Sequence, residues 1–320
     1  MVLIDTAEKI KNMEIRGAGR IACAAVKALK EHSMTVAATD TGTYCREMKQ
    51  AGEQITDTRP TAVSLPNAVH FVISTLDCGL ALNEAREKFE NKCTQFLHSS
   101  ENAIKKIGEI GSSHIRNGDK LLTHCNSQAA LACILEAHRR GRDFEVFATE
   151  VRPRNQGLLT IKILDQAGIP TNYIVDSAVR HFINDIDLVI VGADAVTVNG
   201  AVVNKIGTSQ IALAAHEART NFIVAAETFK FAPRTILGEF IEIEERSKEE
   251  VLPSEIADTL PHVTVRNPAF DVTPAEYVDM IVTEVGAIPP QMAYIIIRDY
   301  LGWSPEEFHM TFDFADHDQE

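Results

Sequence analysis

The feature that most constrains the fold of this chain is an alternation of short apolar runs with helical segments, which begins near residue 118. Strands are predicted in "GDKLLTHC", "FEVFATE", "TNYIVD", "DLVIVGAD" and "NFIVAAE". Helical patterns separate them, from Ser127 to about Arg140, in "GLLTIKILDQAG", "SAVRHFI" and "SQIALAAHEART". Strands that alternate with helices predict a parallel sheet covered on both faces. The runs "PHVTVRNPAFDVTP" and "VDMIVTEVGAIPP" would add late strands.

The part of the chain before this alternation has a mostly helical pattern. The run from Asn83 to Ile115 places Phe89, Cys93 and Phe96 on one stripe of a long helix. "TRPTAVSLPNAVHFVIS" predicts a turn and then another helix, and "MTVAATD" predicts a short strand that ends at Asp40. We therefore expect an α/β protein. A helical N-terminal domain over residues 1–116 would precede a Rossmann-like, doubly wound, mostly parallel sheet domain over residues 117–320.

A glycine-rich turn in "MEIRGAGRIACAA" matches the G-x-G-x-x-A fingerprint of dinucleotide-binding proteins. That fingerprint requires a buried strand directly before its first glycine. Here the preceding residues, "EKIKNMEI", are charged and helical in pattern, and no strand–helix alternation follows Asp40. The pattern therefore disfavours a dinucleotide site. Gly17 and Gly19 would still let the backbone approach a phosphate closely.

Charge and composition exclude several classes of protein. The net charge of −14 argues against broad nucleic-acid binding, although a few local cations would suffice for a small phosphorylated substrate. No apolar run approaches the roughly 18 residues of a membrane span, and the charged N-terminus lacks a signal-peptide core. The six cysteines form no C-x-x-C pair, so zinc-ribbon and thioredoxin readings fail. We expect reduced thiols, a cytoplasmic protein, and no metal or organic cofactor.

Polar side chains cluster where the predicted strands end, which is where open parallel sheets bind ligands. His124, Cys125 and Asn126 follow the first strand. The second strand is followed by Glu150, Arg152, Arg154 and Gln156, the fourth by Asp194, Asn204 and Lys205, and the fifth by Lys230. A thiol, a carboxylate, amides and cations could therefore converge on one crevice.

Each of these candidates also has a simpler interpretation. Cys125 lies between a strand end and a helix start, where backbone N–H groups and the helix dipole favour a thiolate; it could equally be a small buried residue. Asp194 could pair with Lys205, or it could keep its proton in an apolar setting and act as an acid. Lys230 could be a solvated surface charge.

Several sequence blocks, in order, resemble one superfamily. It joins sugar-phosphate isomerases to the α, β and δ regulatory subunits of translation initiation factor 2B. The blocks are "THCNSQAA", "EVRPRNQG", "GADAVTVNGAVVNKIGT", "NPAFDVTP" and "TEVGAIPP". "IRGAGRIA", "TRPTAVSLPNA" and "AAETFKF" are similar to the archaeal ribose 1,5-bisphosphate isomerases in particular. The related 5-methylthioribose-1-phosphate isomerases typically have proline where this chain has Gly19, and the initiation-factor subunits lack the pair formed here by Cys125 and Asp194.

The resemblance implies roles for individual positions. Cys125 would be the proton acceptor and Asp194 the proton donor. Substrate contacts would come from Arg16, Gly17, Ala18, Gly19, Arg59, Ser127, Gln128, Ala129, Gln156, Asn204, Lys205 and Lys230. Of these, Gln156 matches a glutamine of the methylthioribose relatives. One departure follows Cys125, where this chain reads Asn-Ser-Gln and archaeal relatives can have His-Ser-Lys.

The implied reaction converts ribose 1,5-bisphosphate to ribulose 1,5-bisphosphate through a cis-enol phosphate. The N-terminal domain would close over this intermediate and keep it from water. The resemblance also implies a cytoplasmic homo-oligomer, a dimer or a hexamer, with AMP as an activator. It further implies a place in archaeal nucleotide degradation, feeding a RuBisCO-type carboxylase. Two alternatives are 5-methylthioribose-1-phosphate isomerase and a non-catalytic regulatory subunit that binds initiation factor 2.

Overall fold

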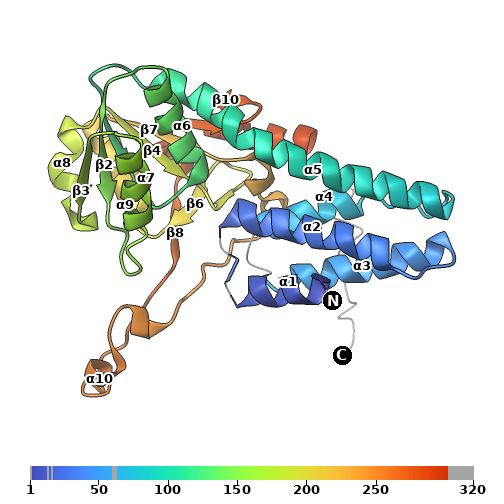
Figure 1. Ribbon diagram of the computed structural model, residues 1–320. Coiled ribbons are helices and arrows are strands. Elements are labelled where there is room, and N and C mark those ends of the chain that lie inside the picture. Colours follow the sequence, from blue (N-terminus) through green and yellow to red (C-terminus); the bar gives the residue numbers. More distant parts are fainter. Residues whose placement is uncertain (1, 13, 16, 60–62, 302–320) are drawn as a thin grey trace, which may run out of the picture.

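The computed structural model describes residues 2–12, 14–15, 17–59 and 63–301 of the 320-residue chain. Five helices form its N-terminal part: α1 (Val2–Lys11), α2 (Ala18–Thr35), α3 (Thr41–Thr56), α4 (Ser64–Ile73) and α5 (Leu82–Gly111). Their apolar faces enclose one core, which includes Ile21, Met48 and Phe89. Figure 1 shows these helices lying side by side, with one end of α5 reaching the sheet.

One predicted strand in this part is wrong. Met34 and Thr35 belong to the last turn of α2, and the residues up to Asp40 form a loop without a strand. Asp40 instead begins a helix, because its side chain accepts a hydrogen bond of 2.9 Å from the backbone N–H of Thr43 and so caps α3. The acid that completes the dinucleotide pattern therefore has a local structural role.

The remainder of the chain is built on a seven-stranded sheet with the order β10-β9-β7-β4-β1-β2-β3. The strands are β1 (Lys120–Thr123), β2 (Glu145–Thr149), β3 (Thr171–Ile174), β4 (Leu188–Gly192), β7 (Asn221–Ala225), β9 (Met280–Thr283) and β10 (Gly286–Ile288). Only β10 is antiparallel to its neighbour. The predicted Rossmann-like, doubly wound architecture is confirmed, with the order of the strands reversing between β1 and β4.

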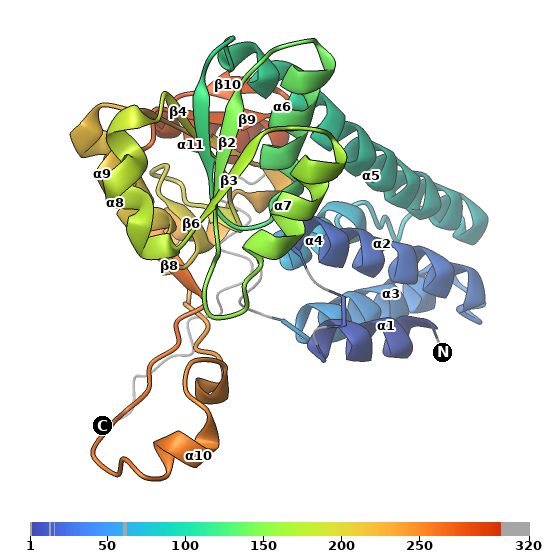
Figure 2. The ribbon, with the colours of Figure 1, turned by 60° about the vertical axis from the view of Figure 1, so that its left-hand side comes forward.

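Helices cover both faces of this sheet, as Figure 2 shows. One face packs against α5, α6 (Gln128–Arg139) and α7 (Gly157–Gln166), and the other against α8 (Val179–Phe182), α9 (Thr208–Ala218) and α11 (Ala293–Ile295). Successive residues of a strand point to opposite faces. In β4, Val189 therefore lies in one core and Ile190 in the other. This explains why the strands read as continuous apolar runs.

A second sheet was not predicted. The strands β5 (Ala195–Val196), β6 (Val202–Lys205) and β8 (Phe270–Thr273) form a three-stranded antiparallel sheet. The late run "PHVTVRNPAFDVTP" was expected to extend the main sheet, but its strand, β8, pairs with β6 instead. This small sheet lies just beyond the carboxyl end of β4.

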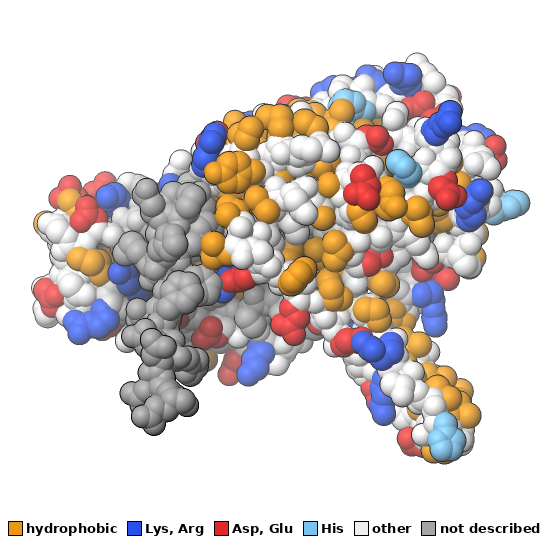
Figure 3. All heavy atoms as spheres, turned by 180° about the vertical axis from the view of Figure 1, so that it is seen from behind, with side chains coloured by type: hydrophobic (Ala, Val, Ile, Leu, Met, Phe, Trp, Pro, Cys, Tyr) orange, Lys and Arg blue, Asp and Glu red, His pale blue; other side chains and the backbone are white. Residues whose placement is uncertain are grey.

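Residues 239–267 form an arm that extends away from the body of the molecule and carries α10 (Ser254–Ala257) (Figures 1 and 2). Several of its apolar side chains are exposed, among them Phe240, Ile256 and Val263. In the view from behind, hydrophobic side chains are visible along the arm and across the body above it (Figure 3).

The helical part and the sheet part are in contact at several places, among them α5 and Asn67. The long helix α5 contributes Phe89 to the helical core and Ile107 to a core of the sheet. Farther along the chain, the buried Asn67 of α4 donates hydrogen bonds of 2.8 and 2.7 Å to the carbonyl oxygens of Phe229 and Phe231. None of the helices in the described residues is long and apolar enough to span a membrane.

Candidate active site

The candidate site lies where the strand order reverses, at the carboxyl ends of β1 and β4. Cys125 comes two residues after β1, and Asp194 comes two residues after β4. The strands are neighbours, so their following loops meet. Gly192, the last residue of β4, permits this, because a Cβ atom there would lie 2.2 Å from the Oγ atom of Ser127. Any side chain at position 192 would therefore push apart the loops that carry Cys125 and Asp194.

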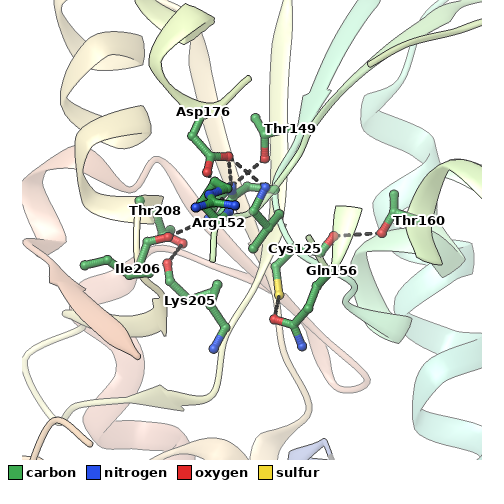
Figure 4. Close-up of polar contacts among 12 residues, drawn as sticks. Cys125, Thr149, Arg152, Gln156, Thr160, Asp176, Lys205, Ile206 and Thr208 are labelled. Atoms are coloured by element: carbon green, nitrogen blue, oxygen red, sulfur yellow. Dashed lines mark hydrogen bonds and ion pairs between the residues drawn. The ribbon is translucent and has the colours of Figure 1, made fainter. Parts of the chain in front are cut away.

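The backbone of Cys125 is held in an uncommon conformation. Its φ angle is +70°, in the left-handed region that residues other than glycine rarely adopt. The hydroxyl of Thr160 in α7 donates a 2.8 Å hydrogen bond to the Cys125 carbonyl oxygen. The thiol donates to the Oε1 atom of Gln156 at 3.6 Å. Figure 4 shows Cys125, Gln156 and Lys205 extending into the same space.

The expectation that the helix start favours a Cys125 thiolate is wrong. Burial raises the pKa of Cys125 to about 11, and the charge of Asp194 acts in the same direction. Lys205 and Arg246 lower this pKa, but not enough to offset burial. In addition, α6 begins at Gln128 with Ser127 as its cap, so Cys125 lies outside the first turn. The group is a thiol at neutral pH.

Asp194 is suited to keep a proton. Burial raises the pKa of its carboxyl, against the opposing charges of Lys230, Lys205 and Arg59. The charge of Lys205 therefore acts on Asp194, but burial is the larger influence on its pKa. The backbone N–H of Asp194 donates a 2.9 Å hydrogen bond to the carbonyl oxygen of Val203, which holds the loop after β4 against β6.

Lys205 is a buried cation at the end of β6. Its ammonium group lies 4.3 Å from the centre of the Phe270 ring, on the neighbouring strand β8. Burial and the nearby charge of Arg246 lower the pKa of Lys205, while Cys125 and Asp194 raise it. Beside it, Asn204 donates a 3.0 Å hydrogen bond to the hydroxyl of Thr208. The small sheet thus positions an amide and a cation beside the thiol.

Lys230 is not a solvated surface charge. Its ammonium group lies 2.7 Å from the Glu227 carboxylate, and both side chains are less than a tenth exposed. Lys230 ends the turn Thr228–Lys230, which directly follows Glu227. Asn67 of the helical part donates a hydrogen bond to the carbonyl oxygen of Phe229 in this turn. Phe229 also packs against Phe96 of α5, with 5.7 Å between ring centres.

His124 has a structural role at this site. Its Nε2 atom lies 2.9 Å from the carbonyl oxygen of Ile206, and its Nδ1 atom lies 2.6 Å from the hydroxyl of Thr149. A carbonyl can only accept, so Nε2 carries the proton and Nδ1 accepts from Thr149. Burial lowers the His124 pKa, which agrees with a neutral ring. The ring ties the loop of Cys125 to the turn after Lys205.

The glycine turn belongs to the helical part and lines the same cavity. Gly17 has a φ angle of +90° and precedes α2. A Cβ atom on Gly19 would lie 3.2 Å from the Glu227 carboxylate. The first backbone N–H groups of α2 therefore lie beside the buried Glu227–Lys230 pair. Such groups are ready partners for an anion.

All the described residues to which the resemblance gives a role line one cavity. They are Gly17, Ala18, Gly19, Arg59, Cys125, Ser127, Gln128, Ala129, Gln156, Asp194, Asn204, Lys205 and Lys230. Arg16 lies outside the described residues. Two cations from the end of β2, Arg152 and Arg154, do not line this cavity; Arg154 instead pairs with Glu250 of the arm.

The sequence analysis missed five charged residues that line the cavity, namely Arg20, Glu227, Glu242, Glu244 and Arg246. Glu244 accepts from Arg59 at 2.9 Å and from Arg246 at 3.3 Å. Glu244 and Arg246 belong to the arm and lie in the charge-rich run "EFIEIEERSKEE", which has the pattern of a solvated segment. The one signal that could have identified Glu244 and Arg246 is the alternation of side chains over residues 244–246 between the cavity and the outside. Among the described residues, no group of His, Cys, Asp and Glu side chains is arranged to hold a metal ion.

Comparison with known proteins identifies the family. A family model described as the initiation factor 2 subunit family matches residues 14–290. This chain belongs to that family. A ribose 1,5-bisphosphate isomerase of Methanocaldococcus jannaschii is 54% identical over 302 residues, which cover 94% of this chain and 96% of that protein. A methylthioribose-1-phosphate isomerase of Acetivibrio thermocellus is 37% identical, covering 90% of this chain and 88% of its own.

The same family appears among solved structures. A protein described as translation initiation factor eIF-2B from Pyrococcus horikoshii OT3 superimposes with a TM-score of 0.76. It is 30% identical and covers 90% of this chain and 97% of its own. The family thus includes both enzymes and initiation-factor subunits on one fold. The higher identities place this chain among the isomerases of the family.

Proposed function

We propose that this chain is a ribose 1,5-bisphosphate isomerase, which converts ribose 1,5-bisphosphate to ribulose 1,5-bisphosphate by acid–base catalysis. One observation carries the proposal: Cys125 and Asp194 line the same cavity as five described cations. The cations are Arg20, Arg59, Lys205, Lys230 and Arg246. Three further carboxylates, Glu227, Glu242 and Glu244, line the cavity as well. A substrate with two phosphates requires cations that can contact both of them.

The chemistry of this substrate accounts for the two catalytic groups. The C1 oxygen of the sugar carries a phosphate, so the ring cannot open to a free aldehyde. An acid must protonate the ring oxygen as the bond from C1 to that oxygen breaks. The raised pKa of Asp194 suits it to this step, because a protonated carboxyl can donate near neutral pH.

The same bond cleavage requires a base at C2. In the proposed mechanism the Cys125 thiolate removes the C2 proton, and C1 and C2 become joined by a double bond in a cis-enol phosphate. The thiol then returns its proton to C1, while the Asp194 carboxylate takes the proton of the C2 hydroxyl. This gives the ketone and restores both groups, so each proton that leaves the enzyme is replaced.

The thiolate must form in a site where the free thiol has a raised pKa. Lys205 and Arg246 supply the charges that favour it. In the empty enzyme, the form with a thiolate and a protonated Asp194 is therefore a minor one. Between the pKa values of the two groups its population does not change with pH, so kcat/KM should be level over that range and fall on both sides.

The phosphates would be held from two directions. The start of α6, capped by Ser127, and the start of α2 each offer backbone N–H groups to an anion. The cations of the loops and of the small sheet lie between them. The Asn-Ser-Gln sequence after Cys125 leaves Gln128, rather than a lysine, at the rim of this site.

The decisive experiment is a coupled assay of the purified chain with ribose 1,5-bisphosphate. We expect ribulose 1,5-bisphosphate to accumulate. If it does not, the assignment fails. Competition against 5-methylthioribose 1-phosphate separates the two isomerase activities, since a higher kcat/KM for the latter would reverse the assignment. Recovery of initiation factor 2 in a pull-down, together with an inactive preparation, would support the regulatory alternative.

We also propose that the protein is a cytoplasmic homo-oligomer, either a dimer or a hexamer. The exposed apolar side chains of the arm, such as Phe240 and Val263, support an assembly that covers them. Activation by AMP and a place in archaeal nucleotide degradation stay predictions from the resemblance. Light scattering at several protein concentrations would test the assembly, and turnover measured with and without AMP would test the activation.

A further inference from the structure

A cluster of three charged residues closes one side of the cavity, and the mechanism above gives no role to its carboxylate, Glu244. Arg59 comes from the loop after α3, whereas Glu244 and Arg246 come from the start of the arm. The Glu244 carboxylate lies 2.9 Å from the guanidinium of Arg59 and 3.3 Å from that of Arg246. The side chain of Glu244 is 25% exposed, that of Arg59 17% and that of Arg246 12%, so water screens these contacts only in part.

The backbone holds this cluster in the cavity wall. The N–H of Ala269 donates a 2.8 Å hydrogen bond to the carbonyl oxygen of Glu244, and the N–H of Arg246 donates a 2.9 Å hydrogen bond to the carbonyl oxygen of Asn267. Residues 244 and 246 therefore face the cavity, while Glu245 points outward and pairs with Arg266. The two cavity-facing residues are thus presented by an extended ladder and not by a disordered charge run.

The charges in the cluster do not balance. The Glu250 carboxylate lies near Arg246, whose charge lowers the pKa of that carboxylate. Within the cluster itself, two guanidinium groups meet a single carboxylate beside Cys125, Asp194 and Lys205. The charge of Arg246 shifts the pKa of each of those three groups downward, which shows that it lies close to the reacting centre. A phosphate dianion between the two arginines would neutralise them fully and could bond to both at once.

We propose that the Glu244 carboxylate takes the place of a substrate phosphate at a subsite formed by Arg59 and Arg246. In the empty enzyme the carboxylate occupies the arginine pair, and an incoming phosphate exchanges with it. This inference rests on the proposed function, since it deepens how that same site takes a doubly phosphorylated sugar. It assigns Arg246 to the binding machinery.

Exchange rather than coexistence follows from charge. A dianion that joined Glu244 at the pair would place two like charges within a few ångströms in a half-buried site, which is unfavourable. The tethered carboxylate also acts as a competitor at high effective concentration. A singly charged ligand gains little by displacing it, whereas a phosphate with two charges and three oxygens gains contacts with both arginines. Glu244 thereby selects for a phosphate at this subsite.

The test measures binding of inorganic phosphate to the full chain by calorimetry, without any turnover. In Glu244→Gln the competitor loses its charge, so phosphate should bind about tenfold more tightly, a change of roughly 1.4 kcal/mol. Glu245→Gln is the matched control, because it removes one charge from the same segment on the outward face; its phosphate affinity should match that of the unaltered protein. Arg246→Gln should weaken binding.

Equal or weaker phosphate binding by Glu244→Gln would overturn the proposal and indicate that the carboxylate only orients the arginines. Glu244→Asp keeps the charge on a shorter side chain and should give an intermediate affinity, which covers the case of a poorly folded glutamine variant. The kinetic counterpart is a lower KM for ribose 1,5-bisphosphate in Glu244→Gln; a higher KM contradicts exchange. Because phosphate binding needs no reaction, an inactive enzyme would contradict the proposed function without deciding this test.

Discussion

The two sides of the cavity are held in different ways. On the sheet side, Cys125, Asp194 and Lys205 each lie within two residues of a strand end, and backbone hydrogen bonds or packed glycines fix their positions. On the loop side, Arg59 and Arg246 lie outside the helices and strands, and both contact the Glu244 carboxylate. In the proposed function, the proton transfers belong to the sheet side, and the loop side contributes to binding of a phosphate.

This difference predicts which substitutions the site should tolerate. Groups that move protons must be placed within a fraction of an ångström, so they need rigid support. Groups that hold a phosphate can exchange partners as the ligand arrives. Four experiments would break or sharpen this contrast, and they are given from the largest expected effect to the smallest.

The largest effect is expected at the two proton-transfer groups. Cys125→Ser and Asp194→Asn should each lower kcat by about 10³-fold or more, since each removes an acid or base that the reaction needs. Turnover of ribose 1,5-bisphosphate would be measured beside the thermal midpoint, which should change little. An active Cys125→Ser enzyme would move the base to another residue and end the assignment of chemistry to the sheet side.

The next effect concerns buried charge. Lys230→Met leaves the Glu227 carboxylate without its partner in a site less than a tenth exposed, so it should cost about 3–5 kcal/mol of unfolding free energy. The double variant Lys230→Met with Glu227→Gln should recover most of that stability. Denaturant unfolding measures both.

A matched pair for this experiment lies on the surface. Lys9 and Asp5 are also 2.7 Å apart, but both are about half exposed. Lys9→Met should give no measurable change in unfolding, because water screens the pair. Equal effects of Lys9→Met and Lys230→Met would show that burial does not decide the strength of these contacts.

Two glycines compare the sides of the cavity directly. A methyl group on Gly192 would lie 2.2 Å from the Ser127 Oγ atom and 2.5 Å from its Cβ atom, so Gly192→Ala should cost about 1–3 kcal/mol and lower kcat. A methyl group on Gly19 would lie 3.2 Å from the far end of Glu227 and in ordinary contact, 3.8 Å, with the Phe229 ring. Gly19→Ala should therefore retain most of the activity.

The outcome is read from kcat, KM and the thermal midpoint of the two variants together. If Gly19→Ala proves the more damaging, the glycine turn is a tighter part of the site than the sheet edge. That result would reverse the contrast between the two sides.

The smallest effect is a shift in the titration of the Cys125 thiol. Asp194 raises the pKa of this thiol and Arg246 lowers it. Asp194→Asn should therefore move the midpoint of alkylation to lower pH, and Arg246→Met should move it to higher pH, from a starting value of about 11. Mass spectrometry of the alkylated peptide follows Cys125 separately from the exposed Cys78.

Shifts of the same sign in the two variants would show that packing, not charge, controls the thiol. His32→Gln serves as the control, since His32 lies in α2 and does not line the cavity. It should leave the Cys125 profile unchanged.

The sequence by itself determined the alternation of strands and helices, because period-2 and helical periodicity record which faces are buried. It also placed Cys125, Asp194 and Lys205 at strand ends, since the carboxyl ends of parallel strands share one edge. The state of these groups was beyond its reach. Burial, which raises the pKa of Cys125, depends on residues far apart in the chain, and a helix start alone predicted the opposite.

Only the tertiary structure decided the other side of the cavity. Arg59 and Glu244 are 185 residues apart, and no local pattern links them. The run that contains Glu244 and Arg246 resembles a solvated segment until residues 267–269 pair with it and turn alternate side chains inward. In the same way "MTVAATD" has the composition of a strand, but no neighbouring strand is available to pair with it. Local sequence carries periodicity and capping, whereas pairing across long loops is set by the packing of the whole chain.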